Sequence, residues 1–176
     1  MKYLIAGLGN PGEEYELTRH NVGARALGEF AKRNKNKKLR LLAPTTFMNR
    51  SGEAAGKLVK SKAAAEKLIV IHDDLDLPFG RFKISFGRGS GGHRGVESVI
   101  KKLKTEKFIR LRIGIAPSTP TGKIKKPVGE DKIVKFILGQ FMSKEEIGLK
   151  KLMPKLVEAL ETITTAGLAG AMNKFN

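Results

Sequence analysis

The sequence contains no cysteine in its 176 residues. Disulfides, a thiolate nucleophile and a thiolate-bound zinc are therefore excluded, and the absence is typical of a cytoplasmic protein. Tryptophan is missing too, and aromatic residues amount to only 6%, which disfavours a stacking surface for single-stranded nucleic acid. Apolar runs of membrane-spanning length are lacking, as is a basic and apolar leader at the amino end. We therefore expect a globular protein of the cytoplasm.

What the sequence has in excess is positive charge. Lysine and arginine number 34 against 17 acidic residues, a formal net charge of +17. Such a field attracts polyanions, with nucleic acid as the first candidate and an anionic membrane surface as the second. A lysine-rich surface that only keeps the protein in solution would have the same composition, so charge alone leaves the partner open.

Apolar runs that alternate with amphipathic stretches predict an α/β fold. We expect strands at 2–9, 39–44, 67–78, 81–88 and 108–117, the third ending in an acidic loop. We expect helices at 19–33, 51–62, 131–138 and 144–166, and one more after the glycine pair at 91–92. This order predicts one domain, residues 1–176, with a mixed twisted sheet flanked by helices on both faces. The polar segment 117–129 is expected to be a solvated surface loop, with a lid over a site as the alternative.

The stretch “GLGNPG” matches the G-x-G-x-x-G pattern of dinucleotide-binding turns. That function requires a helix that begins at the glycines, with free backbone N–H groups facing the phosphates. Here Pro11 lacks an N–H, and Glu13 and Glu14 would repel phosphate. The helical pattern starts only near Arg19. The glycines therefore indicate a tight turn that holds Asn10 at the carboxyl end of the first strand, and a nicotinamide enzyme is the disfavoured alternative.

Two residues stand where α/β folds place catalytic groups. His20 opens the first helix beside the carboxyl end of the first strand, and Asp73 follows the apolar run “LIVIH”. A histidine backed by a buried carboxylate can take a proton from water, because the carboxylate fixes its tautomer and stabilises the imidazolium. A helix cap for His20 and a loop cap for Asp73 are the structural alternatives, and these two residues alone do not decide between them.

The acidic run “HDDLD” also has the composition of a magnesium site, with Asp73, Asp74 and Asp76 as oxygen ligands. No phosphate-binding loop or second acidic cluster completes such a site, so we expect neither a metal nor a cofactor. Ser51 and Ser90 both lie outside the G-x-S-x-G context of a serine hydrolase. If the protein is a hydrolase, the expected nucleophile is therefore water.

Two further motifs, “PTTFMNRSG” and “GGHRG”, carry groups suited to a peptide-like ligand. Asn49 has an amide that both donates and accepts, which suits a carbonyl group. Phe47 and Met48 beside it predict an apolar wall, with ordinary core packing as the alternative. The second motif brings backbone N–H groups and Arg94 to the start of a helix, and a plain capping turn is its alternative.

Five motifs occur in order along the chain: “GLGNPGEEYELTRHNVG”, “PTTFMNRSG”, “HDDLDLPFG”, “GGHRGVESVI” and “FIRLRIGI”. In this combination the chain resembles the bacterial-type peptidyl-tRNA hydrolases over nearly its whole length. The resemblance implies hydrolysis of the ester between a peptide, or an N-blocked amino acid, and the 3′ ribose of tRNA, which recycles tRNA from aborted translation. It also implies a cytoplasmic monomer that acts on peptidyl-tRNA without a cofactor, a covalent intermediate or an obligate protein partner.

The resemblance further implies roles for individual residues. His20 would be the general base on water, Asp73 would stabilise it, and Asn10 would favour substrates with a blocked amino group. Asn49 would complete the catalytic set. The residues implied in binding substrate and tRNA are Tyr15, Phe47, Met48, Asn49, His93, Arg94 and Arg112.

Two features depart from the pattern of that family. Arg94 stands where the family usually has an asparagine, which leaves open whether this position places water or peptide, or instead binds a phosphate. The segment 34–43, between the first helix and the second strand, is shorter than usual, so an edge hairpin is expected to be missing.

Basic residues between positions 81 and 112 are candidates to bind phosphates of the tRNA acceptor arm, by shape rather than by base sequence. The chief alternative function is an RNA-binding protein on the same fold without catalysis, since fold alone does not decide function. Retention of the four catalytic residues together favours the enzyme. The basic candidates are Arg81, Lys83, Arg88, Lys101, Lys102, Lys104, Lys107, Arg110 and Arg112.

Overall fold

A five-stranded sheet forms the centre of the computed structural model, which describes residues 3–34, 36, 39–119 and 121–176. Its strands have the spatial order β2-β1-β3-β5-β4. Four of them run parallel, and β4 is antiparallel to β5 at one edge. The mixed sheet expected from the sequence is therefore confirmed. The bounds are β1 (Leu4–Gly7), β2 (Arg40–Leu42), β3 (Leu68–Pro78), β4 (Phe82–Phe86) and β5 (Ile109–Ala116).

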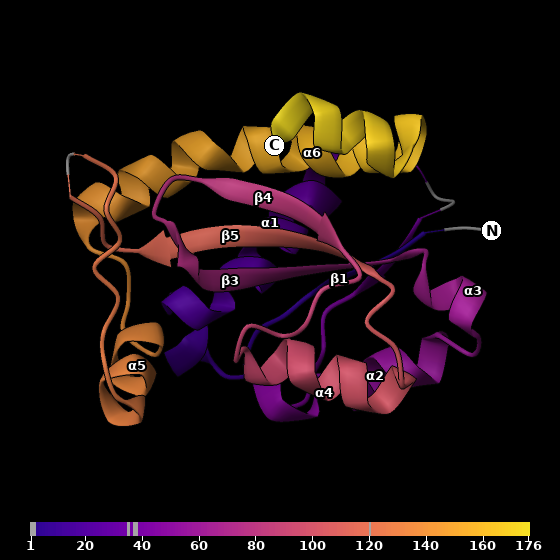
Figure 1. Ribbon diagram of the computed structural model, residues 1–176, viewed down its shortest axis with the longest axis horizontal. Helices are drawn as coiled ribbons and strands as arrows, with labels where there is room; N and C mark the ends of the chain where they lie inside the picture. Colours follow the sequence, from indigo (N-terminus) through magenta and orange to yellow (C-terminus); the bar gives the residue numbers. More distant parts are fainter. Residues whose placement is uncertain (1–2, 35, 37–38, 120) are drawn as a thin grey trace.

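Helices cover both faces of this sheet (Figure 1). α1 (Val22–Arg33) and α6 (Ser143–Phe175) pack on one face, and α2 (Ser51–Leu58) and α4 (Arg94–Leu103) pack on the other. The short α3 (Lys62–Ala65) precedes β3, and α5 (Glu130–Ile137) lies beyond the carboxyl ends of β3 and β5. Among the described residues, no helix is long and apolar enough to cross a bilayer.

Alternation of side chains along β3 separates two apolar cores. Leu68 and Val70 pack with α2 and α4, whereas Ile69 and Ile71 pack with α1 and α6. All four side chains are fully buried, which explains the unbroken apolar run “LIVI”. The same alternation directs Asp73 toward the face covered by α1.

The acidic segment after this run is strand, so the loop expected from the sequence is wrong. β3 continues to Pro78 and pairs Asp73 with Ile113 and Asp74 with Gly114 before its register shifts. Gly114 permits this pairing, because a side-chain carbon there would lie 2.1 Å from the Pro78 backbone oxygen. The Asp73 side chain is consequently held on a hydrogen-bonded strand rather than on a loop.

The expected helices occur with shifted ends. The first begins as a 3₁₀ turn at Arg19–Asn21 before α1, and the second ends at Leu58. The last continues to Phe175 across a kink at Gly167, where φ is 86°. These shifts leave the layer order unchanged.

Parts of two expected segments lie outside the described residues. They are Lys35, Lys37 and Lys38 of the connector 34–38 and Pro120 of the segment 117–129. The hairpin expected to be missing at 34–43 therefore stays a prediction. β2, which follows that connector, is an edge strand beside β1.

The start of α1 packs against strand backbone without an intervening side chain. A Cβ atom on Gly23 would lie 2.3 Å from the Ile71 oxygen and 2.9 Å from the Leu8 oxygen. Backbone atoms of the sheet cannot give way cheaply, so only glycine fits at this crossing. The close approach fixes the 3₁₀ turn that carries His20 against the carboxyl ends of β1 and β3.

Replacing Gly23 with alanine should therefore destabilise the protein by about 1–3 kcal/mol, the usual cost of overpacking. The matched control is Gly28→Ala on the same helix, where an added Cβ meets nothing within 4 Å. Because glycine is a poor helix former, that control should be neutral or stabilising by up to about 1 kcal/mol. Denaturant unfolding measures both, and equal effects of the two changes would contradict the packing argument.

Candidate active site

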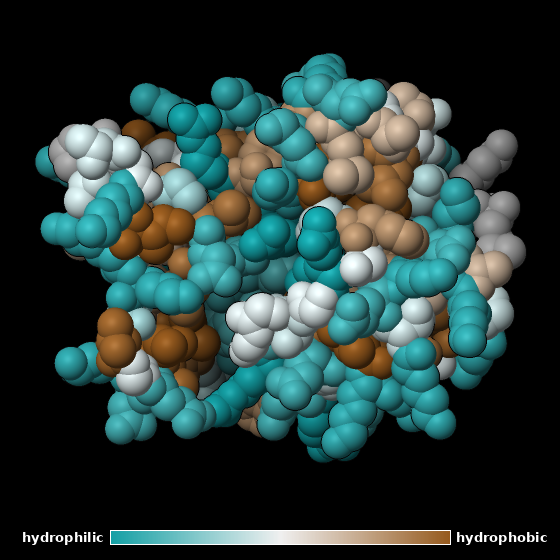
Figure 2. Space-filling model, in the orientation of Figure 1, coloured by the Kyte–Doolittle hydropathy of each residue, from teal (hydrophilic) through white to brown (hydrophobic). Residues whose placement is uncertain are grey.

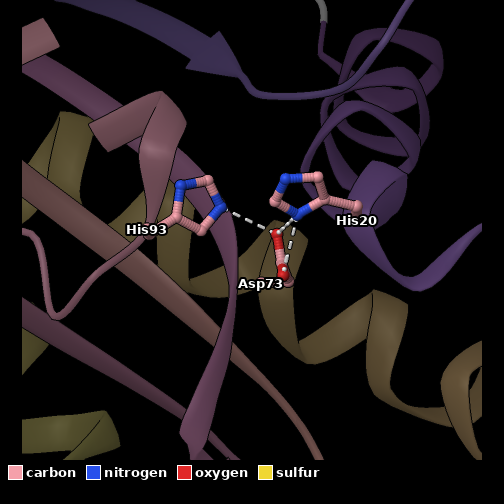
Figure 3. A group of neighbouring side chains, drawn as sticks. All are labelled: His20, Asp73 and His93. Atoms are coloured by element: carbon pink, nitrogen blue, oxygen red, sulfur yellow. Dashed lines mark hydrogen bonds and ion pairs between the residues drawn. The ribbon is translucent and has the colours of Figure 1, made fainter. Parts of the chain in front are cut away.

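One buried carboxylate binds two imidazole rings at the carboxyl edge of the sheet (Figure 3). His20 Nδ1 lies 2.9 and 3.1 Å from the two carboxylate oxygens of Asp73, and His93 Nε2 lies 2.8 Å from Oδ1. Asp73 is 3% exposed and His20 6%. His20 comes from the 3₁₀ turn before α1, Asp73 from β3, and His93 from the residue that caps α4.

Asp73 remains ionised in this environment. Burial raises the pKa of its carboxyl, but electrostatic attraction to the neighbouring His20 and His93 and the hydrogen bonds with them hold that pKa well below the usual range. An ionised carboxylate only accepts hydrogen bonds, so Nδ1 of His20 is a donor. Nε2 of His20 has no hydrogen-bond partner among the described residues and lies on the side of the ring away from Asp73 (Figure 3), and His20 lines the cavity. Nε2 is therefore the ring nitrogen available to take a proton.

The cavity in front of His20 has a volume of about 780 Å³. One wall comes from α5 and the residue after it, and the opposite wall from the segment 47–50. Apolar side chains gather over α5, as the brown surface at the lower left of Figure 2 shows. A ligand bound here would have an apolar side and a polar end at His20. The apolar lining comprises Phe47, Met48, Leu75, Ile133, Val134, Ile137 and Leu138.

Asn10 presents an amide donor to this cavity. Its backbone N–H donates to Asn21 Oδ1 at 2.8 Å, and its backbone oxygen accepts from Asn21 Nδ2 at 2.8 Å. Its own Oδ1 accepts from the Met48 backbone N–H at 2.8 Å. These contacts fix the side-chain amide and leave Nδ2 without a partner among the described residues. The G-x-G-x-x-G turn thus holds Asn10, as the sequence predicted, and Gly9 allows the approach because a Cβ there would lie 3.1 Å from Asn21 Cγ.

The motif around Phe47 lies in the opposite wall. Phe47 is 55% exposed and lines the cavity, whereas Met48 beside it is 4% exposed. Tyr15 is not among the lining residues but meets the Phe47 ring edge-on, with centroids 6.4 Å apart. Asn49 is exposed and lines the cavity. The predicted apolar wall is therefore formed by Phe47 and Met48, with Tyr15 as a support behind it.

Three acidic groups at the cavity are each matched to a cation. Arg112 Nε donates to Asp74 Oδ2 at 2.7 Å, and Lys126 Nζ donates to Asp76 Oδ1 at 2.7 Å. Arg94 forms an ion pair with Glu130 at the start of α5, and both of these residues line the cavity. The acids of “HDDLD” thus turn to different partners rather than to a shared magnesium. Asp73 with His20 and His93 has metal-binding residue types within 4.8 Å, but hydrogen bonds already join the three.

Several residues of this site carry no recognisable sequence signal. Asn21 follows a histidine in an ordinary helix start, and only the fold shows that its amide holds Asn10. The apolar face of α5 has a helical pattern, but nothing in it indicates which surface it covers. The segment 117–129, expected to be solvated, supplies Lys126 and Gly129 to the lining. Arg112 is not a lining residue, but it donates a hydrogen bond to Asp74, which is one.

Comparison with known proteins gives one consistent result. Residues 4–176 match the family model described as peptidyl-tRNA hydrolase. A peptidyl-tRNA hydrolase of Syntrophotalea carbinolica is 38% identical over 192 aligned positions, covering 98% of this chain and 96% of the relative. One of Thermosynechococcus vestitus is 36% identical and covers 98% and 93%. The crystal structure of a peptidyl-tRNA hydrolase from Acinetobacter baumannii has a TM-score of 0.84 at 29% identity, covering 99% of this chain and 94% of that one.

A third histidine beside the site is locked in its neutral form. His72 is 1% exposed, its Nδ1–H donates to the Asp73 backbone oxygen at 2.7 Å, and its Nε2 is buried without a partner among the described residues. Burial lowers the pKa of His72 well below the ordinary 6.5. The unfolded chain therefore binds a proton on this histidine at a pH where the folded chain does not.

Stability should consequently fall as the pH drops below about 6.5, the pKa of an unperturbed histidine. His72 makes its full contribution to the free energy of unfolding above that pH. Between pH 7 and pH 5 about 1–2 kcal/mol of this contribution is lost. In His72→Gln this part of the decline should disappear, whatever the absolute stability of the variant. Free energies of unfolding at the two pH values measure it, and an unchanged decline would show that His72 is not the titrating group.

Proposed function

The chain belongs to the peptidyl-tRNA hydrolase family, which makes it a hydrolase of translation, and we propose that it cleaves its ester by direct attack of a water that His20 activates. The substrate would be a peptide, or an N-blocked amino acid, esterified to the 3′ ribose of tRNA. One observation carries the mechanism: His20 Nδ1 lies 2.9 Å from the ionised Asp73, and His20 lines the cavity with Nε2 on the side of the ring away from Asp73. The enzyme would act as a cytoplasmic monomer without a cofactor or an obligate protein partner.

In the first step, water attacks the ester carbonyl carbon while His20 Nε2 takes one of its protons. Asp73 stabilises the resulting imidazolium and keeps the ring in the tautomer that leaves Nε2 free. The tetrahedral intermediate then collapses, the bond to the ribose oxygen breaks, and the imidazolium returns its proton to that oxygen. The products are the free peptide carboxylic acid, which releases its remaining proton to solvent, and the tRNA 3′ hydroxyl, and His20 is neutral again.

A covalent acyl-enzyme is not required by this scheme. The cavity hydroxyl, Ser90 Oγ, accepts a hydrogen bond from the Gly92 backbone N–H at 3.2 Å and has no histidine or carboxylate hydrogen-bonded to it among the described residues. Ser51 Oγ donates to the Met48 backbone oxygen at 2.8 Å and is buried. Cysteine is absent from the sequence. Water is thus the nucleophile that these contacts favour.

The developing oxyanion needs a donor, and Asn10 is suited to supply it. Its Nδ2 has a fixed direction because its Oδ1 is held by the Met48 N–H. Preorganised amide donors of this kind contribute a few kcal/mol to transition-state stabilisation. Asn49, which is exposed and lines the same cavity, is the second candidate to hold the substrate carbonyl.

Preference for a blocked amino group follows from the charges of the cavity. A free aminoacyl group would bring an ammonium next to the apolar wall of α5, where it loses hydration. The acids that could compensate it, Asp74, Asp76 and Glu130, are already paired with cations. An acylated nitrogen has no charge and is not penalised in this way. The peptide would lie along α5.

Phosphate binding is best supported on the β4–β5 surface. Arg110 is 4% exposed, and its Nε is buried with no partner among the described residues. Burial, followed by the nearby charge of Arg112, lowers the pKa of Arg110, so the site favours an incoming anion. Lys83 lies opposite Arg112 across the strands, and Arg88 follows β4. We propose that these residues bind tRNA phosphates, with Arg112 as the one nearest the cavity through Asp74.

The decisive assay compares N-acetyl-aminoacyl-tRNA with free aminoacyl-tRNA. We expect rapid release of tRNA from the first and little from the second. His20→Asn should reduce kcat by at least about 100-fold with tRNA affinity unchanged, since general bases commonly contribute that much. The rate should fall in acid, because only a neutral histidine accepts a proton.

Two outcomes would overturn this function. Full activity of His20→Asn would assign the base elsewhere. Tight tRNA binding by the wild-type protein with no ester cleavage would instead favour the RNA-binding alternative on the same fold. The second outcome is read from the same preparations, because binding and turnover are measured side by side.

The phosphate proposal is tested by salt. Each phosphate contact adds about 0.9 to the slope of log affinity against log salt concentration, so Lys83→Ala combined with Arg88→Ala should lower that slope by about 2. The matched control is Lys151→Ala combined with Lys155→Ala, which removes the same charge from exposed positions of α6. An equal fall in both double variants would mean that binding responds only to net charge.

A further inference from the structure

His93 occupies both of its ring nitrogens. Nδ1 accepts from the backbone N–H groups of Gly95 at 3.1 Å and Val96 at 3.2 Å, and so caps α4. Backbone N–H groups can only donate, so Nδ1 holds no proton. Nε2 lies 2.8 Å from Asp73 Oδ1, which only accepts because the carboxyl is ionised. The proton of the neutral ring is therefore on Nε2.

His20 has the opposite tautomer on the same carboxylate. It donates from Nδ1 and keeps Nε2 free, whereas His93 donates from Nε2 and uses Nδ1 as a helix cap. Although the two rings lie only 4.9 Å apart between centroids, just one of them can act as a base. The resemblance implies that His93 binds substrate, and although His93 lines the cavity, both of its ring nitrogens already have hydrogen-bond partners.

The position of the His93 ring is set by the packing of α4. Gly95 and Val96 are buried in the first turn of that helix. A Cβ on Gly95 would lie 2.5 Å from Met48 Sδ and 3.1 Å from His93 Cε1, so glycine makes room for both side chains. The ring also meets His72 edge-on, with centroids 4.7 Å apart. The cap and these contacts hold Nε2 in one place.

We infer that His93 is a positioning residue, whose fixed Nε2–H orients the Asp73 carboxylate toward His20 and takes up part of its negative charge. The inference rests on the proposed function, in which His20 is the base. Two donors share one buried carboxylate, and Oδ1 serves both of them. A carboxylate with a single donor would be freer to rotate and would interact more strongly with a protonated His20.

This arrangement has a consequence for the pH profile. The titratable groups that face the His93 ring are Asp73, His20 and His72, and Arg94 next to it in the chain points to Glu130. Without the Nε2–H of His93, the imidazolium of His20 is stabilised relative to its neutral form. The base is then protonated at a higher pH, and the acid limb of kcat/KM moves upward.

Two substitutions separate the cap from the contact with Asp73. In His93→Asn, the Oδ1 atom takes the place of Nδ1 and caps α4, since asparagine is among the best capping residues, but the side chain is too short to reach Asp73. In His93→Gln, the amide nitrogen is as many bonds from Cβ as Nε2 is, so it restores the donor, but glutamine caps poorly. His93→Asn thus keeps the helix cap and loses the donor to Asp73, whereas His93→Gln keeps the donor and weakens the cap.

The two variants should behave in opposite ways toward N-acetyl-aminoacyl-tRNA. His93→Asn should keep the wild-type KM, lose about tenfold or more in kcat, as do enzymes that lose an outer hydrogen-bond partner, and shift its acid limb upward by about half a pH unit. His93→Gln should melt at a lower temperature but retain most of kcat and the wild-type acid limb. The His20 ring, followed by NMR titration, should show the same shift in the asparagine variant.

Each contrary result has a definite meaning. A wild-type kcat and acid limb in His93→Asn would overturn the inference and leave His93 as a cap alone. A raised KM with kcat unchanged would make it a substrate-binding residue. Loss of activity in His93→Gln as large as in His93→Asn would also contradict it, because the donor is then not what matters. Failure of the proposed function is distinguishable, since it appears as full activity in His20→Asn.

Discussion

The organisation of this protein depends on one buried negative charge. The Asp73 carboxylate is 3% exposed and would be costly to bury alone, yet it is kept ionised by imidazoles from two different segments. His20 approaches from the α1 face of the sheet and His93 from the end of α4 on the other face. The helices on both faces must therefore be in place before the charge is satisfied. The site can therefore form only when the helices on both faces of the sheet have packed.

The glycines of the chain serve this same requirement. Gly23 lets the start of α1 touch strand backbone, Gly95 makes room for the His93 ring, and Gly114 lets β3 continue past the acidic residues. The G-x-G-x-x-G turn belongs to this set, because it brings Asn10 against Asn21 instead of cradling a phosphate. Close backbone approach, rather than nucleotide binding, is the common reason for these residues.

Charge is distributed unevenly over the molecule. The chain has a formal net charge of +17, but the acids around the cavity are individually matched, including the Arg94–Glu130 pair at the departure from the family pattern. The charged side chains of the cavity are thus largely paired beside an apolar wall, while on β5 the buried Arg110 has no partner for its Nε among the described residues and lies near Arg112. A peptide and a polyanion are suited to these two regions respectively, which is the division that a peptidyl-tRNA substrate needs.

Much of this was readable from the sequence, because strand and helix periodicity, turn residues and motif order are local properties. Periodicity and turn residues predicted the mixed sheet and the turn that holds Asn10, and the family resemblance implied the pairing of His20 with Asp73. They failed for the acidic segment, where pairing with Gly114 extends the strand. The tautomers of His20 and His93, the support of Asn10 by Asn21 and the covering of the cavity by α5 were decided only by the tertiary structure. A hydrogen bond is set by the direction between groups that lie far apart in the chain, and no local pattern specifies that direction.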